Sequence, residues 1–170
     1  MNESQFDQAV LREAFACFPS GVTAVCAMVD GAPVGIAASS FTSVSLDPAL
    51  VSICVAHSSS TWPILRVASR LGVSVLAQDH DNICRSLARK TGDRFAHVAW
   101  EANATGSVVV HGSTLWLECS IDSEILAGDH NIVVLRIHEV RPYPDIAPLV
   151  FHGSRFRQLN AEEPSLAGTR

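Results

Sequence analysis

The chain has 170 residues, 48% hydrophobic and 17% charged, with 12 basic and 17 acidic residues that give a formal net charge of −5. This length predicts one domain with a single sizeable core, and the acidic balance without any basic run excludes the electrostatic footprint of a nucleic-acid-binding protein. We expect one domain over residues 1–159 and a disordered polar tail over 160–170.

Cysteine spacing and apolar run lengths indicate the compartment. The five cysteines are scattered, and no two have the spacing of a zinc knuckle or a redox dithiol. No apolar run approaches the ~20 residues that cross a bilayer, and residues 1–7 lack the features of a signal peptide. We therefore expect reduced cysteines, a cytoplasmic protein and no membrane association. The low share of charged residues also predicts an oligomer, whose interface would bury the excess apolar surface.

The first part of the chain predicts one helix followed by strands. Residues 5–18 carry apolar side chains at helical spacing, with Ser4 available as the cap. Asp30-Gly31 is a strong hairpin signal between two apolar segments. Strands are therefore expected over 22–29, 33–38 and 50–55.

The remainder of the chain alternates short helices with strands. Helices are expected over 62–68 and 78–89, because each range begins near a suitable cap or carries apolar residues on one side. Strands are expected over 71–77, 108–110, 115–121, 132–138 and 149–151. Many strands joined by tight turns indicate a mainly β protein with peripheral helices. The strand pattern alone fits an antiparallel barrel or a sandwich.

Several common catalytic motifs are absent from the sequence. There is no Gly-x-Gly-x-x-Gly motif, no phosphate-binding loop that ends in Gly-Lys-Ser/Thr, and no Gly-x-Ser-x-Gly nucleophile elbow. His80 and Cys84 stand four residues apart on an expected helix, which suits a metal ion, but no third ligand accompanies them. We expect no metal site.

Small and hydroxyl-bearing residues gather between Gly35 and Pro48. The side chains of Ala37, Ala38, Ser39 and Ser40 are small enough for backbone N–H and C=O groups to approach a flat, polar-edged ligand. The alternative is a loop whose hydroxyls serve only its turns.

Two later segments suit a phosphate group. Residues 58–61 supply hydroxyls just before the expected helix at 62–68, where backbone N–H groups are unpaired. Arg89, Lys90 and Arg94 follow the next helix, and one of them could neutralise the same phosphate. The alternatives are helix capping by Ser or Thr and solvated cations at a helix end.

Gly128-Asp129-His130 lies just before the strand expected over 132–138. Gly128 permits a tight turn, and Asp129 could orient the imidazole of His130. The alternative is a turn aspartate beside a surface histidine.

Taken in order, these segments resemble the flavin reductase-like family, and the resemblance covers about residues 15–159. It implies an antiparallel split β-barrel and an NAD(P)H:flavin oxidoreductase that transfers hydride from NADH or NADPH to FMN or FAD. It also implies a homodimer and a partner flavin-dependent monooxygenase. By the same resemblance, His130 and Asp129 are the catalytic pair. The implied cofactor-binding residues are Ala37, Ala38, Ser39, Ser40, Ser45, Cys54, Ser59, Thr61, Lys90, His152 and Arg155.

The sequence departs from the family pattern at two positions. The family often has Thr near Ala37, and often has Pro-Pro where this chain has Pro48-Ala49. Two other readings remain: a flavin-binding electron carrier or sensor, and a related barrel with another oxidoreductase substrate, against which Gly128-Asp129-His130 argues. The choices between FMN and FAD, and between NADH and NADPH, stay open.

Overall fold

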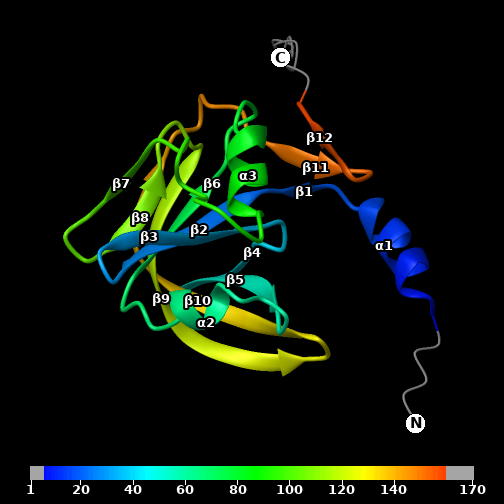
Figure 1. The fold of residues 1–170 in the computed structure, drawn as a ribbon, viewed down its shortest axis with the longest axis horizontal. Coiled ribbons are helices and arrows are strands. Elements are labelled where there is room, and N and C mark those ends of the chain that lie inside the picture. The colour runs from blue at the N-terminus through cyan, green and yellow to red at the C-terminus, as the bar shows by residue number, and fades with distance from the viewer. Residues whose placement is uncertain (1–5, 160–170) are drawn as a thin grey trace, which may run out of the picture.

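Antiparallel strands are the main regular structure of the computed structural model, which describes residues 6–159 (Figure 1). The tail expected over 160–170 lies outside the described residues. The helices are α1 Gln8–Ala16, α2 Trp62–Leu65 and α3 Asp81–Leu87. The strands are β1 Ser20–Gly21, β2 Thr23–Val29, β3 Ala32–Ala38, β4 Thr42–Leu46, β5 Ala49–Ala56, β6 Leu71–Val75, β7 Trp100–Ala102, β8 Ser107–Val110, β9 Leu115–Ala127, β10 His130–Pro142, β11 Val150–His152 and β12 Arg155–Arg157.

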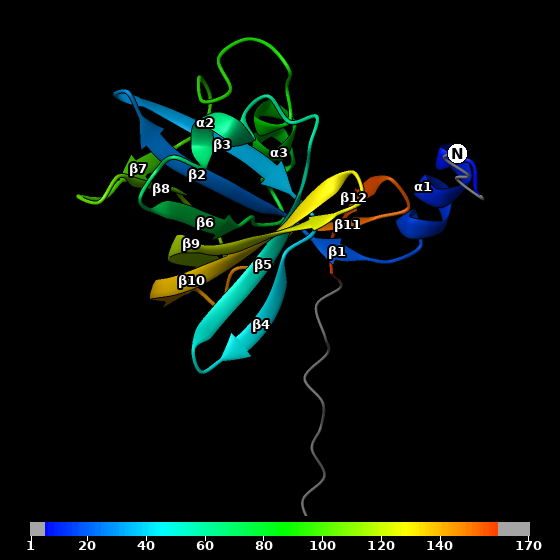
Figure 2. The same ribbon diagram turned by 90° about the horizontal axis from the view of Figure 1, so that it is seen from below.

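Nine of the strands in the described range form one curved sheet. Its order is β4-β5-β10-β9-β6-β2-β8-β7, and β3 pairs with the free side of β2. A smaller sheet of β1, β11 and β12 lies beside α1 (Figure 2). Every pairing is antiparallel, which confirms the expectation of a mainly β fold with peripheral helices.

Strand β2 separates two apolar cores, because its side chains alternate and both of its faces are buried. Val25 and Ala27 belong to the first core, whereas Ala24 and Cys26 belong to the second, which α3 covers. The first core also contains Ile53, Leu65, Leu71, Val73, Leu117, Val133 and Leu135. The second also contains Leu76, Leu87, Phe95, Val108 and Leu149. A strand that is buried on both faces has apolar residues at successive positions, and this pattern explains why the sequence predicted β2 well.

Helix α1 is shorter than the expected range 5–18. Asp7 is its cap, since the Asp7 carboxylate accepts a hydrogen bond of 2.6 Å from the N–H of Ala9. Ser4, the cap expected from the sequence, lies outside the described residues. No residue of α1 is buried, and the helix stands apart from the curved sheet (Figure 1).

Four strands were not expected from the sequence: β1, β4, β7 and β12. They are short and partly or largely exposed, so their side chains show no clear alternation. Strands β9 and β10 are 13 residues each, longer than the ranges 115–121 and 132–138. Their added residues are mostly exposed, so the apolar pattern stops before the strands do. Helices α2 and α3 are shorter than expected.

The hairpin expectation agrees with the structure. Asp30 and Gly31 both adopt positive φ, 50° and 80°, as the turn between β2 and β3 requires. All five cysteines are unpaired, and burial raises the pKa of the Cys26 thiol to about 12. None of the helices within residues 6–159 has the length and apolar character to cross a membrane.

Candidate functional site

A groove of about 580 Å³ opens where β3, β5, α2, α3 and the start of β10 meet. These elements are far apart in the sequence, so only the fold brings their residues together. The groove is lined by most of the residues that the sequence singled out: Ala37, Ala38, Ser39, Ser40, Cys54, Ser59, Thr61, Lys90 and His130. Ser58, Ser60, Leu87, Ala88 and Arg94 also line it, among others.

The outer edge of β3 forms one wall of the groove. On β2, the N–H of Met28 donates to Gly106 O at 2.8 Å, toward β8, and Cys26 also pairs with β8. Gly35 is the partner of Cys26 on β3, and because Cys26 turns its N–H and C=O away from β3, Gly35 turns its own away from β2. Backbone groups alternate in direction along a strand, so Ala37, two residues further on, also directs its N–H and C=O away from β2. Among residues 6–159, the N–H and C=O of Ala37 have no partner, so Ala37 offers a donor and an acceptor beside a small side chain.

Ser40 fastens the end of this wall to β5. Its hydroxyl accepts a hydrogen bond of 2.8 Å from the N–H of Cys54 and donates one of 3.2 Å to the carbonyl of Cys54. The hydroxyl of Ser40 is thus occupied by the protein itself, while Ser39 and the side chain of Cys54 are exposed. The wall is fixed in place, and from Ala37 to Ser40 it presents small side chains to the groove.

Hydroxyls and two cations occupy the end of the groove near α2. Ser59 Oγ accepts a hydrogen bond of 3.1 Å from the N–H of Trp62, the first residue of α2, so this hydroxyl is bonded to the protein itself. Arg94 Nη1 donates to Thr61 Oγ1 at 2.8 Å and to Gly35 O at 3.0 Å, which ties β3 to α2. Lys90 is exposed beside them. The sequence offered Arg94 as one of three cations that could neutralise a phosphate, and the structure places it on the groove wall.

His130 lies where the arm formed by β9 and β10 turns back toward the groove. Gly128, with φ of 65°, takes the first position of the two-residue turn. Asp129 Oδ1 lies 2.7 Å from His130 Nδ1, and this hydrogen bond is the main cause that lowers the pKa of Asp129. The carboxylate is therefore ionised and holds the imidazole by Nδ1. Within the described residues, Nε2 of His130 has no protein partner.

A chain of polar contacts anchors this turn to the barrel. The N–H of His57 donates to Asp129 O at 2.9 Å, and His57 Nε2 lies 2.9 Å from Asn131 Oδ1. Asn131 Nδ2 then donates to Glu124 at 3.1 Å, and Glu124 pairs with Arg66 at 3.0 Å. These contacts join β5, the arm and the end of α2. They fix the backbone that carries His130.

Three expected cofactor-binding residues do not line this groove: Ser45, His152 and Arg155. Ser45 pairs with Leu50, at the other end of the β4–β5 hairpin from Cys54. His152 and Arg155 pair with each other on the β11–β12 hairpin. Arg155 lines an adjacent hollow that shares only Ala88 with the groove. Spacing along the chain could not reveal these separations, because each depends on where a hairpin folds back.

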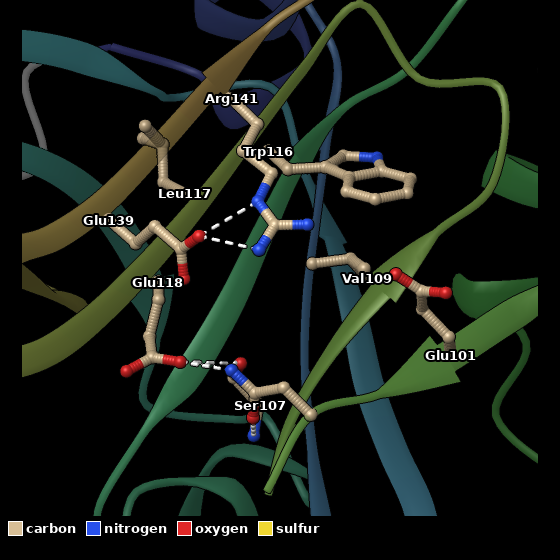
Figure 3. A pocket seen from close by; sticks show the side chains of 9 residues that line it. Glu101, Ser107, Val109, Trp116, Leu117, Glu118, Glu139 and Arg141 are labelled. Carbon is tan, nitrogen blue, oxygen red and sulfur yellow. Dashed lines mark hydrogen bonds and ion pairs between the residues drawn. The ribbon is translucent and has the colours of Figure 1, made fainter. Parts of the chain in front are cut away.

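Another hollow lies between β7–β8 and β9–β10 and contains charged side chains (Figure 3). Arg141 pairs with Glu139 at 2.6 Å, and Glu118 accepts hydrogen bonds from Asn103, Thr105 and Ser107. Desolvation raises the pKa of Glu118, but these bonds and Arg70 outweigh it and lower the pKa overall. With a volume of about 50 Å³ and its polar groups paired, this hollow suits no ligand of cofactor size.

Comparison with known proteins identifies relatives along nearly the whole chain. Residues 15–160 match the model of the flavin reductase like domain. A probable flavin reductase of Rhizobium meliloti is 40% identical over 81% of this chain, which spans 44% of that relative's length. A flavin reductase of Pseudomonas putida is 35% identical, over 88% of each chain. Further relatives are named as reductase components of flavin-dependent monooxygenases.

Solved structures agree with this result. An NADH:FAD oxidoreductase of Streptomyces globisporus, in complex with NAD and FAD fragments, superposes with a TM-score of 0.85. It is 34% identical to this chain, and the match covers 94% of this chain and 95% of the other. The curved antiparallel sheet is thus the flavin reductase split barrel. On sequence and on fold, the chain belongs to the flavin reductase-like domain family.

Proposed function

We propose that the chain is an NAD(P)H:flavin oxidoreductase that reduces FMN or FAD and releases it to a separate flavin-dependent monooxygenase. The groove carries this proposal, because a strand edge, two cations and a histidine surround one hollow of about 580 Å³. The relatives named as flavin reductases and as monooxygenase reductase components support the reaction and the partner.

The wall residues suit a flavin. The isoalloxazine ring has a flat face and an edge of alternating hydrogen-bond donors and acceptors, which the N–H and C=O of Ala37 can meet in one plane. Ala38 and Ser39 leave room for the ring to approach the backbone. At the other end, Lys90 and Arg94 supply positive charge for the flavin phosphate, beside the hydroxyl of Ser60.

When bound, the flavin supplies a ring nitrogen that accepts hydride from the nicotinamide of the reduced nucleotide. The protein positions the two rings against each other and needs no nucleophile for this step. His130 lies at the rim where the nicotinamide can enter, with Nδ1 held by Asp129. We assign His130 to contact the nicotinamide and Asp129 to fix the orientation of His130.

We further propose that the chain forms a homodimer and acts in the cytoplasm. Large apolar side chains are exposed on α1 and its end, on β4 and at the tip of the arm: Phe15, Phe18, Leu46 and Leu126. Such a set of exposed apolar residues favours burial in an interface. Unpaired cysteines suit a reducing compartment. A light-scattering mass of 18.2 kDa, that of one chain, would contradict the dimer.

The purified protein should oxidise NADH or NADPH when FMN or FAD is added, because the proposed site has room for the flavin ring beside the nicotinamide. Loss of absorbance at 340 nm, measured for all four combinations, tests this. Absence of turnover in every combination would contradict the proposal. A protein that purifies with tightly bound flavin but oxidises neither nucleotide would instead be an electron carrier.

Replacement of Lys90 should weaken binding of phosphorylated flavins only. Lys90→Ala should raise the KM for FMN about tenfold, which corresponds to the loss of one charge-assisted contact, and leave the KM for riboflavin unchanged. Arg89→Ala is the matched control, since Arg89 is an adjacent exposed cation that does not line the groove. Equal effects of the two substitutions, or an equal effect on riboflavin, would remove Lys90 from the phosphate site.

Replacement of His130 should affect the nucleotide more than the flavin. His130→Ala should lower kcat/KM for NADH by about tenfold or more, since orientation of the nicotinamide is lost, while the flavin Kd changes little. His138→Ala serves as the control, because His138 is on the same strand but outside the groove. Wild-type rates in His130→Ala would exclude His130 from the reaction.

A further inference from the structure

A second hollow, of about 390 Å³, adjoins the groove at its cationic end. The two hollows share Ser60, Thr61, Lys90 and Arg94. We propose that this second hollow receives the adenosine half of FAD, so that FAD rather than FMN is the preferred flavin of this chain. The proposal rests on the proposed function, because it extends the flavin groove by one more subsite.

The position of the positive charges matches the shape of FAD. In FAD a pyrophosphate joins the flavin half to the adenosine half, so its negative charges lie between the two ring systems. Lys90 and Arg94 line both hollows and therefore lie at the passage between them. A pyrophosphate at this passage would direct the flavin ring toward Ala37 and the adenosine toward Pro33 and Ile64.

The edge of β3 provides a hydrogen-bonding pattern that fits adenine. The alternation that turns Gly35 outward also turns the carbonyl of Pro33 outward. Arg94 donates a hydrogen bond to the carbonyl of Gly35, so of the two backbone groups of Gly35 the N–H remains available as a donor. This donor is two residues along the strand from the carbonyl of Pro33, which is the acceptor. Adenine presents an amino donor next to a ring-nitrogen acceptor, the complement of this pair.

The other walls suit a nucleoside rather than a further phosphate. Ile64 is on α2 with 49% of its surface exposed, and with Val34 it gives the hollow apolar sides for the faces of a base. Asp93 also lines the hollow, and one of its oxygens accepts the N–H of Phe95 at 2.8 Å. The carboxylate suits ribose hydroxyls and repels an additional phosphate group.

The first test compares the affinities of FAD and FMN. Fluorescence titration of the wild-type protein should give a Kd for FAD about tenfold below that for FMN, as burial of one base against an apolar side chain predicts. Ile64→Ser should weaken FAD binding about fivefold and leave the FMN Kd within about twofold. Val67→Ser is the control, since Val67 is exposed just beyond α2 and lines neither hollow.

The second test examines recognition of the base edge. Flavin hypoxanthine dinucleotide carries a carbonyl in place of the amino group and a protonated ring nitrogen, which reverses the donor and acceptor. It should bind no more tightly than FMN. Equal wild-type affinities for FAD and FMN would overturn the proposal. The proposal would also be overturned if Ile64→Ser raised the KM for NADH in an assay with FMN and left the affinity for FAD unchanged. NADH oxidation with FMN tests the reductase function separately from either result.

Discussion

The one-sided pairing of β3 is the constraint on which the candidate site depends. β2 is hydrogen-bonded to β6 and β8 along one side, so β3 can pair only along its other side. The outer edge of β3 therefore keeps backbone donors and acceptors free of strand partners. An exposed edge normally invites association with another strand. Here Arg94, α2 and the loop before Phe95 stand over part of that edge, and the remainder faces two hollows.

Arg94 has a structural and an electrostatic role at the same place. Its guanidinium joins a carbonyl of β3 to the hydroxyl of Thr61, which fixes the width of the groove at the end where phosphate would lie. The same charge, with that of Lys90, makes this end attractive to anions in a chain whose formal net charge is −5. Local charge and overall charge thus differ in sign. A composition-level argument about binding partners misses this difference.

The position of the histidine on the groove wall depends on contacts that join β5, the arm and the end of α2. His57, Asn131 and Glu124 link β5 to both strands of the arm, and Arg66 extends the chain of contacts beyond α2. A long two-stranded arm with mostly exposed side chains would otherwise carry His130 on a mobile tip. The polar chain fixes the base of the turn, and Asp129 then fixes the ring. Placement of His130 is therefore a property of three elements rather than of its own turn.

The sequence by itself determined the strands that are buried, the hairpin at Asp30-Gly31 and the small residues Ala37 to Ser40. Each leaves a local signal, because burial imposes apolar runs, positive φ selects Asp-Gly, and close backbone approach requires small side chains. The tertiary structure alone decided that Lys90, Arg94, Cys54 and His130 share one groove, and that Ser45, His152 and Arg155 lie outside it. It also decided that Ser40 is bonded to Cys54 and that one edge of β3 is free. These facts depend on which strands pair and where hairpins fold back, and contacts between distant segments leave no periodic pattern in a single chain.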